Sequence, residues 1–401
     1  MKILYHHRTR GEDAQGIHIR ALCAAFRELG HQVVLVGPPR RRSAALFPPG
    51  GAPPGTGVAD ARPSLAGLVI PHWFYELLAL AYNTVAVPVL LAQALRHRPG
   101  LIYERYALFS LAGLCVARVV RRPFILEVNA PLSLELRQHG HLWLRGLAQR
   151  VEDFLCRSAT RTVVVSQAMA EILKNRGIPA ERLLVMPNGV DQDRFHAGVD
   201  GESVRSRLRL TGCRVVGFVG WVRRWHGVDG LMAALAPRLR RDPGLRLLVV
   251  GDGPALPDLR ARARQLGVED RVCFAGAVSQ EEVPAYIAAL DIAVQPAVTE
   301  YASPIKLFEY LALGCPVVAP DQANIRELIR PGVTAEVFPP GDWGVLGVRL
   351  EELLDDPQRC RQLGERGAAS IPEHGYTWRA NAERVLAAVE AGGSLPVTEG
   401  L

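Results

Sequence analysis

The sequence predicts an α/β protein with two domains, each built on a parallel sheet. The chain has 401 residues, of which 49% are hydrophobic, and chains of this length usually divide into domains of about 100–200 residues. Short apolar runs typical of strands alternate with amphipathic helical patterns along the whole chain. Because two parallel strands need a crossover between them, usually a helix, this alternation predicts βαβ units.

The first series of elements begins at the amino terminus. KILYHH, residues 2–7, has the composition of a strand, and a helix is expected over residues 18–30, ending at the capping residue Gly30. Further strands are expected at QVVLVG, LIYERY, FILEVNA and TRTVVVS. Residues 38–71 are rich in Pro and Gly, which predicts a long surface loop whose arginines at 40–42 are solvated.

The second series begins near Arg214. RVVGFVGWV, LRLLVVGDGP, RVCFAG, DIAVQPA and PVVAPD are expected strands, and GVDGLMAALAPRLRRD is an expected helix between the first two. We place the first domain at residues 1–195 and the second at residues 204–372, with a final helix at about 376–392.

The chain is basic, with a formal net charge of +7 and a pI of about 9.2. Nearly all of the positive charge is arginine, which binds phosphate in a bidentate manner, so an anionic partner is expected: a phosphorylated metabolite, a nucleic acid or an anionic membrane. Codon usage that favours arginine over lysine would explain the same composition. Aromatic residues make up only 6% of the chain and no stacking motif is found, so we do not expect nucleic acid as a partner.

The cysteines and the amino terminus point to a reducing compartment. The seven cysteines include no CxxC pair, which predicts free thiols and no metal site. MKILYHH runs directly into a strand, so no signal peptide is expected. We therefore expect a cytoplasmic protein.

One apolar segment approaches the length of a membrane span. Residues 77–95 carry no charge over 19 positions. Asn83, Thr84, Pro88 and Gln93 interrupt the segment, so a buried or membrane-touching helix is expected in place of a span.

An anion site is predicted between an expected strand, DIAVQPA, and an expected helix, SPIKLFEYLALG. Pro304 suits the first turn of that helix and Gly314 suits its end. Free backbone amides at the helix start and Lys306 would face the carboxyl end of the strand, where open parallel sheets bind ligands. Glu309, one turn later, could accept hydrogen bonds from a ribose diol. The alternative is an exposed Lys306–Glu309 ion pair.

Other loops after strands carry weaker signals. GWVRRWHGVDGL places Arg223, Arg224 and His226 just before a helix, where arginines can hold a diphosphate. GDGPAL has GxG without the third glycine of a dinucleotide fingerprint, and RTRGEDAQG, which contains Gly16, does not match that fingerprint either. Each of these loops would equally suit an ordinary strand-to-helix turn.

Five motifs follow one another along the chain: VMPNGVDQDRF, VGFVGWVRRWHGVDGL, LLVVGDGP, VCFAGAVSQEEVPAYIAALDIAVQPA and SPIKLFEYLALGCPVVAP. Together with the amino-terminal segment MKILYHH…GIHIRALCAAFRELGHQVVLV, this ordered set resembles the family-4 retaining glycosyltransferases. The resemblance implies a GT-B fold, with two Rossmann-like domains and parallel sheets facing across a cleft. The carboxyl domain would bind a nucleotide sugar and the amino domain an acceptor, the last helix would pack back onto the amino domain, and no metal would be needed.

Several positions depart from the family pattern and indicate a sub-branch with WHG and SPIKLFEY variants. Tyr301 occupies the position of the first of two glutamates, with Glu300 adjacent, while Glu309 matches the second. Trp221 follows Gly220 where the family often has arginine, and His226 replaces a lysine. Asn129 in LEVNAP stands in place of an amino-domain histidine.

The resemblance carries over a set of expected roles. The residues expected to stabilise charge or act in catalysis are Arg223, Arg224, Lys306, Glu300 and Asn129. Those expected to bind the donor are Gly16, Gly220, His226, Gly251, Gly253, Ser303, Pro304, Ile305, Lys306 and Glu309. Those expected to bind the acceptor are His18, Glu127 and Asn129.

The expected function is transfer of a sugar, with retention, from a nucleoside-diphosphate sugar to an acceptor in cell-surface polysaccharide or glycolipid synthesis. The donor is a co-substrate, and no cofactor is expected. Peripheral contact with the inner face of the cell membrane is an option for a lipid-linked acceptor. A soluble small-molecule acceptor, a GT-B nucleotide-sugar 2-epimerase, and a nucleotide-binding module without turnover remain as alternatives.

Overall fold

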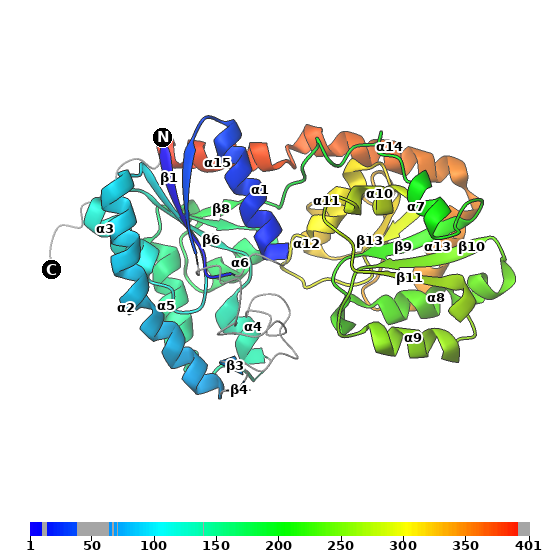
Figure 1. Ribbon diagram of the computed structural model, residues 1–401, viewed down its shortest axis with the longest axis horizontal. Helices are drawn as coiled ribbons and strands as arrows, with labels where there is room; N and C mark the ends of the chain where they lie inside the picture. Colours follow the sequence, from blue (N-terminus) through cyan, green and yellow to red (C-terminus); the bar gives the residue numbers. More distant parts are fainter. Residues whose placement is uncertain (10–13, 38–63, 66–67, 70, 139, 392–401) are drawn as a thin grey trace. The chain divides into compact units, whose positions relative to one another are not determined.

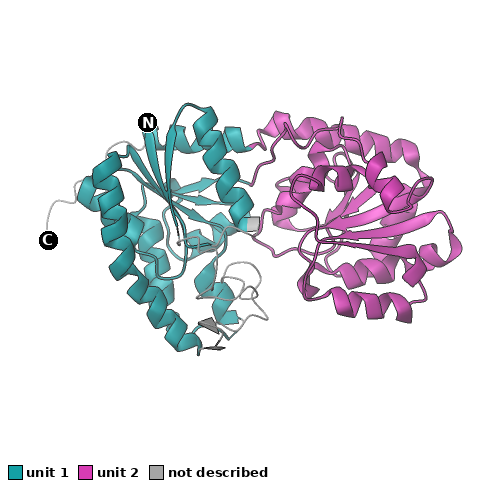
Figure 2. Cartoon of the chain, viewed as in Figure 1, with its two compact units in different colours: residues 1–187, 378–401 teal, residues 188–377 magenta. Residues whose placement is uncertain are grey.

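The computed structural model describes residues 1–9, 14–37, 64–65, 68–69, 71–138 and 140–391. The loop expected at residues 38–71, with its three arginines, lies largely outside this part of the chain. The chain divides into two compact units (Figure 2). The amino-terminal unit comprises residues 1–187 and 378–401, and the carboxyl-terminal unit comprises residues 188–377.

The amino-terminal unit is built on a six-stranded parallel sheet in the order β2-β1-β5-β6-β7-β8 (Figure 1). Its strands are β1 (Lys2–His6), β2 (Gln32–Val36), β5 (Leu101–Arg105), β6 (Phe124–Val128), β7 (Arg161–Val164) and β8 (Leu183–Val185). Its helices are α1 (Ala14–Glu28), α2 (His72–His97), α3 (Ala112–Val120), α4 (Leu132–Gln138), α5 (Arg145–Ser158), α6 (Gln167–Asn175) and α15 (Trp378–Ala391). Two short antiparallel strands, β3 (Ser64–Leu65) and β4 (Leu68–Val69), precede α2.

The carboxyl-terminal unit repeats this architecture with the order β11-β10-β9-β12-β13-β14, again all parallel. Its strands are β9 (Arg214–Val219), β10 (Leu245–Val250), β11 (Val272–Gly276), β12 (Ile292–Val294), β13 (Val317–Pro320) and β14 (Glu336–Phe338). Its helices are α7 (Glu202–Arg207), α8 (Val228–Arg241), α9 (Leu256–Gln265), α10 (Val283–Ala288), α11 (Ile305–Ala312), α12 (Ala323–Arg326), α13 (Trp343–Asp355) and α14 (Pro357–His374).

The inner strands are short and largely buried, because helices cover both faces of each sheet, whereas the edge strands β2, β8, β11 and β14 are partly exposed. β5 and β6 are buried at every position, and so are β12 and β13. Such strands appear in the sequence as continuous apolar runs, as expected for parallel sheets. The prediction of two α/β domains with parallel sheets is confirmed.

The last helix, α15, is grouped with the amino-terminal unit, where it packs against α1. The Trp378 ring lies 4.7 Å from the ring of His18 on α1, and the Asn381 side chain donates a hydrogen bond to the Pro187 carbonyl. The unit boundary in the structure falls after Pro187, ahead of the predicted linker between residues 195 and 204.

Candidate functional site

The carboxyl-terminal unit has its topological switch point between β9 and β12. The chain runs outward to β10 and β11 on one side of this pair and to β13 and β14 on the other. Open parallel sheets form a ligand-binding crevice at such a point, outside the carboxyl ends of the strands. Two of the predicted site segments meet here, since Gly220 follows β9 and residues 295–304 connect β12 to α11.

The loop between β12 and α11 is held by two buried asparagines. The Asn188 backbone amide donates to Ser303 Oγ at 3.0 Å, and its side chain donates to the Ser303 carbonyl at 2.6 Å. The side chain of Asn324, which is fully buried on α12, donates to the carbonyls of Thr299 and Ala302. These contacts fix the start of α11 in a loop that has no regular structure of its own. Ser303 therefore helps to hold this loop in place, because its hydroxyl accepts a hydrogen bond from the Asn188 amide.

Helix α11 is fastened to the end of β9 through Tyr310. The Tyr310 hydroxyl accepts from the Val219 amide at 2.8 Å and lies 3.3 Å from the Val219 carbonyl. Pro304 is the residue before the helix, which begins at Ile305, and Gly314 ends it in the left-handed region at φ 69°. Pro304 thus lies one position earlier than the sequence indicated, while the predicted glycine stop is confirmed.

Lys306 extends from the first turn of α11 across the end of β9. Its Nζ lies 3.9 Å from the centroid of the Phe218 ring, an arrangement that favours a cation. A Cβ added to Gly220 would lie 2.6 Å from the same Nζ, so the absence of a side chain at Gly220 leaves room for the ammonium group. Burial lowers the pKa of Lys306 to about 7, against the opposing effect of Glu309.

Glu309 lies one turn after Lys306 on the same helix. Burial raises the pKa of Glu309 to about 7, while Lys306 and Arg194 act in the opposite direction. The ion pairs found among the described residues do not include a Lys306–Glu309 contact within 4 Å. The exposed pair that the sequence left open as an alternative is therefore not formed, and both groups lie half-buried at the end of the sheet.

His226 is a neutral, structural member of this group. Burial, together with the charges of Lys306 and Arg223, holds the pKa of its ring far below the usual range. Its Nδ1 lies 3.3 Å from the Arg223 backbone amide, and its ring centroid lies 5.4 Å from that of Phe218, with the two planes tilted by 51°. The donor-binding role predicted for His226 stays a prediction, and without a bound anion its ring is neutral.

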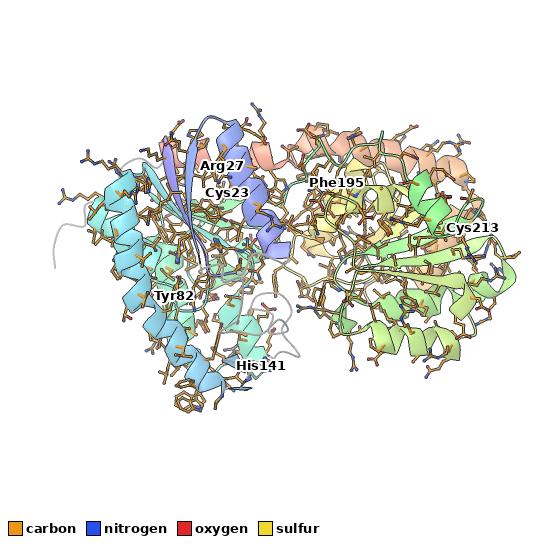
Figure 3. The ribbon with its side chains drawn as sticks, in the orientation of Figure 1. Cys23, Arg27, Tyr82, His141, Phe195 and Cys213 are labelled. Carbon is orange, nitrogen blue, oxygen red and sulfur yellow. The ribbon has the colours of Figure 1, made fainter. Side chains whose placement is uncertain are left out.

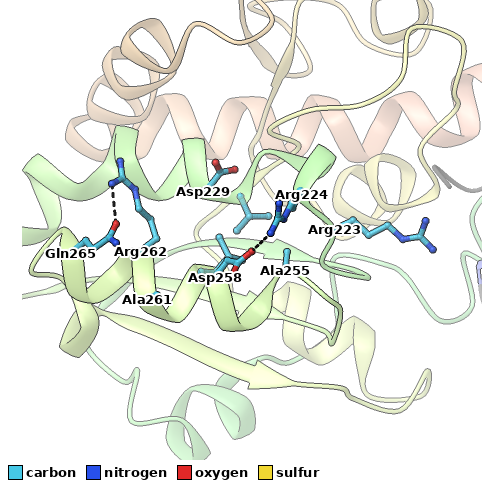
Figure 4. Close-up of a pocket in the computed structure, with 10 residues that line it drawn as sticks. Arg223, Arg224, Asp229, Ala255, Asp258, Ala261, Arg262 and Gln265 are labelled. Carbon is cyan, nitrogen blue, oxygen red and sulfur yellow. Dashed lines mark hydrogen bonds and ion pairs between the residues drawn. The ribbon is translucent and has the colours of Figure 1, made fainter. Parts of the chain in front are cut away.

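The side chains of the two predicted arginines, Arg223 and Arg224, extend in different directions (Figure 4). Arg224 forms an ion pair with Asp258 of α9 at 2.7 Å, and both side chains are largely exposed. Arg223 and Arg224 both line a surface groove of about 500 Å³ formed with residues of α8 and α9, and the Arg223 side chain extends away from Asp258 and Arg262 (Figure 4). Since Arg223 is close enough to His226 to lower its pKa, Arg223 and Lys306 are the cations that meet here. The catalytic role predicted for Arg224 stays a prediction, and in the structure its guanidinium is paired with Asp258.

The glycines after β10 have a packing role. A Cβ on Gly251 would lie 2.1 Å from the Gly220 carbonyl oxygen, and one on Gly253 would lie 2.1 Å from the Val222 carbonyl oxygen. Both glycines also have positive φ angles, 120° and 156°. Their conformations let the loops after β9 and β10 approach closely, and the donor-binding role predicted for both glycines stays a prediction. Glu300 lies exposed in the turn after β12.

In the amino-terminal unit, the predicted acceptor residues gather around one buried carboxylate. Glu127, at the end of β6, is fully buried. Its Oε2 accepts from the hydroxyls of Tyr5 and Tyr103, at 3.3 and 2.7 Å, and its Oε1 accepts from Arg105 at 2.5 Å. These partners come from β5, which pairs with β6, and from β1 on the far side of β5.

His18 and Asn129 bind the same carboxylate. His18 Nε2 lies 3.2 Å from Glu127 Oε1, and the Asn129 side-chain amide donates to that oxygen. Despite burial, the charges of His18 and Arg105 and the bonds from His18 and Asn129 hold the pKa of Glu127 well below its usual range. Glu127 is thus surrounded by donors of this chain. The acceptor contact predicted for Glu127 stays a prediction, and in the structure its carboxylate contacts His18 and Asn129. Gly16 lies buried in the first turn of α1, near His18 in sequence.

A second buried pair was not singled out from the sequence. His6 Nδ1 lies 3.2 Å from Glu104 Oε2, and both side chains are buried at the switch point between β1 and β5. His6 Nε2 also lies 3.3 Å from the hydroxyl of Tyr82, which extends from α2 (Figure 3). The sequence feature that could have revealed His6 and Glu104 is a charged or titratable residue at the end of an apolar strand, as in LYHH and IYER.

No group of three or more His, Cys, Asp or Glu side chains suited to a metal ion is found among the described residues.

Two family models match successive parts of the chain. Residues 15–194 match Glycosyltransferase Family 4, and residues 213–356 match Glycosyl transferases group 1. The chain is 29% identical over 283 residues to the alpha-D-kanosaminyltransferase of Streptomyces kanamyceticus, covering 67% of this chain and 71% of the relative. It is 32% identical over 214 residues to a GDP-mannose-dependent alpha-(1-6)-phosphatidylinositol monomannoside mannosyltransferase of Mycolicibacterium smegmatis, covering 52% of this chain and 56% of the relative.

Among solved structures, HepE of Anabaena in complex with UDP superposes on the chain with a TM-score of 0.72 and 19% identity, covering 98% of this chain and all of that one. At this identity the likeness establishes the fold. The two parallel-sheet units, the family matches and the similar transferases identify the chain as a glycosyltransferase of the GT-B fold.

Proposed function

We propose that the chain transfers a sugar, with retention of anomeric configuration, from a nucleoside-diphosphate sugar to a hydroxyl acceptor. The observation that carries this proposal is the arrangement of cations at the end of β9. The charges of Lys306 and Arg223 both lower the pKa of His226, and Lys306 has no ion-pair partner within 4 Å in the described part of the chain. A desolvated ammonium in that position favours an anionic ligand, and the diphosphate of a nucleotide sugar supplies one.

The remaining features of this unit suit the rest of such a donor. The start of α11 adds backbone amides and the positive end of a helix dipole beside Lys306. Glu309, with its pKa raised to about 7, ionises more readily when a vicinal diol donates to it, as the ribose of the nucleotide can. The Anabaena HepE structure holds UDP, and the mycobacterial relative is named as GDP-mannose-dependent, so the class of donor is supported while the base is left to experiment.

In the proposed reaction, the bond between the sugar C1 and the diphosphate oxygen breaks while the acceptor oxygen bonds to C1 on the same face. The negative charge that develops on the leaving diphosphate is stabilised by Lys306, Arg223 and the first amides of α11. The acceptor proton passes to an oxygen of that leaving phosphate, so charge and atoms balance without a metal or other cofactor.

We assign the acceptor to the amino-terminal unit. His18 and Asn129 are held by Glu127, whose carboxylate is supplied with donors from Tyr5, Tyr103 and Arg105. Side chains fixed in this way can hydrogen-bond an uncharged hydroxyl without adding a free charge to its site. We propose that the acceptor belongs to a cytoplasmic pathway of cell-surface polysaccharide or glycolipid synthesis. The mycobacterial relative is named for a phosphatidylinositol monomannoside, which supports that class.

Calorimetric titration with UDP, GDP and ADP tests the donor site. Wild-type protein should bind one nucleotide at micromolar concentration in the presence of a chelator. Lys306→Met and Glu309→Gln should each weaken binding at least about tenfold, the loss of one charge-assisted contact. Arg224→Met is the matched control, because Arg224 is paired with Asp258 outside the cluster, and it should bind as wild type. Binding of no nucleotide, or equal loss in all three variants, would refute the assignment.

A further inference from the structure

Helix α2 of the amino-terminal unit presents a long apolar stripe to solvent. Five large hydrophobic side chains are 45 to 63% exposed and recur along one side of the helix: Trp73, Leu77, Val85, Val89 and Leu95. Between them the exposed positions are Ala81, Thr84, Pro88 and Ala92, and the Thr84 hydroxyl donates to the Ala81 carbonyl within the helix. The stripe spans 22 residue steps, about 33 Å of helix. By length and composition α2 could cross a membrane. Only 22% of its most apolar stretch is buried within the protein, so most of this stretch faces outward.

The opposite side of α2 is fastened to the unit by polar contacts. The Glu76 carboxylate is buried and accepts from the backbone amides of Trp143 and Leu144, at 2.6 and 2.7 Å. The Asn83 side chain donates to the Phe109 carbonyl at 2.8 Å and accepts from the Leu111 amide at the same distance. A helix that crossed a bilayer would have to break these contacts and carry Glu76 into hydrocarbon, which is costly. The geometry therefore fits a helix that lies along a surface.

In the segment that begins with α2, residues 71–158, the acidic side chains are buried and the exposed charged side chains are basic. Over residues 71–158, every acidic side chain is buried, and these are Glu76, Glu104, Glu127, Glu135, Glu152 and Asp153. Over the same described residues the exposed charged side chains are all arginines: Arg96, Arg98, Arg118, Arg121, Arg122, Arg137, Arg145, Arg150 and Arg157. The surface of this segment thus combines exposed apolar groups with a single sign of charge.

Further apolar groups extend the stripe at the start of α2. Trp143 is 69% exposed and Leu147 is 43% exposed. Their segment contacts this end of the helix, because the Trp143 amide is bonded to Glu76 and the rings of His72 and His141 stack at 4.6 Å. Tryptophan is enriched where apolar side chains meet the lipid headgroups. We use the term α2 face for the α2 stripe together with Trp143 and Leu147.

We propose that the α2 face binds peripherally to the surface of a bilayer that contains anionic phospholipid, with α2 in the plane of the membrane. The apolar stripe would enter the boundary between headgroups and acyl chains, and the surrounding arginines would contact lipid phosphates. Amphipathic helices with apolar and basic sides bind membranes in this manner, and their affinity rises with anionic lipid. The charge segregation favours such a surface over an uncharged protein partner. The proposal stands on the amino-terminal unit alone and does not depend on glycosyl transfer.

Vesicle co-sedimentation of the purified full chain tests the proposal. The vesicles are phosphatidylcholine alone and an equal mixture of phosphatidylcholine and phosphatidylglycerol, each at low and high salt. Wild-type protein should bind the anionic vesicles at least about tenfold more tightly than the neutral ones and should lose this preference in high salt. Val85→Glu places a charge at the centre of the stripe and should abolish binding. Val348→Glu, at a 53% exposed position on α13 of the other unit, is its control and should bind as wild type.

The charge contribution is tested by a second pair of variants. Arg96→Gln with Arg122→Gln should weaken binding to anionic vesicles by about tenfold or more, since each basic residue near an anionic surface adds to the attraction. Arg361→Gln with Arg366→Gln, exposed on α14, removes the same net charge elsewhere and should have little effect. Thermal unfolding of every variant shows whether it is folded, and its nucleotide affinity shows whether the donor site is intact. A folded variant that binds nucleotide but no vesicles therefore bears on the membrane proposal alone.

Three results would overturn the proposal. The first is equal binding of neutral and anionic vesicles, or no binding of either. The second is wild-type protein that stays with the vesicles in alkaline carbonate, as a spanning helix would. The third is a lipid-free dimer that Val85→Glu converts to a monomer without any vesicle binding, which would assign the α2 face to a second copy of the chain.

Discussion

Lys306 should make nucleotide binding depend on pH in a way that identifies the residue. Burial lowers the pKa of Lys306 to about 7 in the unliganded protein. A diphosphate bound beside the ammonium group would raise that pKa again, because an adjacent negative charge favours the protonated form. The bound state then holds more protons than the free state above about pH 7. Affinity must therefore fall as the pH rises from about 7, with the full contribution of Lys306 present only below that value.

The size of the effect follows from the fraction of free protein that carries the charge. With a pKa of about 7, roughly half of the lysines are protonated at about pH 7 and about one in a hundred at about pH 9. If the diphosphate keeps the bound lysine charged throughout, the association constant falls about 50-fold over that interval. Calorimetric titration with the preferred nucleoside diphosphate at several pH values measures the decline directly.

Lys306→Arg provides the matched control. Arginine stays protonated over the whole interval, so the variant should show a nearly flat pH profile even if its altered geometry weakens binding. The parent nucleoside, which lacks phosphate, should bind weakly, and its association constant should not fall as the pH rises. A wild-type profile that is flat between about pH 7 and pH 9, or a decline of the same slope in the arginine variant, would refute the assignment of Lys306 to the diphosphate.

Four further variants test the framework. Gly251→Ala should lower the free energy of unfolding by about 2 kcal/mol or more in urea titration, because its Cβ would meet the Gly220 carbonyl oxygen and φ is 120°. Glu127→Gln should cost about 3 kcal/mol, since an amide would replace half of a buried acceptor that serves five donors; an unchanged urea midpoint would contradict this account. Tyr310→Phe should cost about 1–3 kcal/mol and weaken nucleotide binding, because the Val219 amide loses its acceptor. Arg224→Ala should change neither stability nor nucleotide affinity measurably, because its exposed pair contributes little.

The fold could be predicted where the apolar signal was long. β9, β10 and β13 lie within runs of four to six buried residues that the sequence displays directly. β8 and β14 were not predicted, because each has three residues and a partly polar or half-buried pattern that resembles a loop. Their positions at the sheet edges depend on pairing with β7 and β13, which a local pattern does not encode.

The candidate donor site was only partly accessible from sequence. Lys306 and Glu309 share one helix, so their spacing was sufficient to place them together. Phe218 lies 88 positions before Lys306, and Asn188 lies 115 positions before Ser303, so their contacts exist only through the sheet topology. The divergence of Arg223 and Arg224 also could not be predicted, since it depends on the position of Asp258 on α9.

The two units differ in how their buried charges are balanced, and this difference favours the division of roles between donor and acceptor. In the amino-terminal unit Glu127 is matched by Arg105, His18, Asn129 and two tyrosines, so an added charge would find its potential partners already engaged. In the carboxyl-terminal unit burial moves the pKa values of Lys306 and Glu309 toward each other, to about 7, without forming a direct ion pair between them. A desolvated cation of this kind gains most from an anion, whereas a fully paired carboxylate cluster is suited to orienting a neutral hydroxyl. The diphosphate is therefore expected at the carboxyl end of β9, and the uncharged acceptor hydroxyl is expected beside His18 and Asn129.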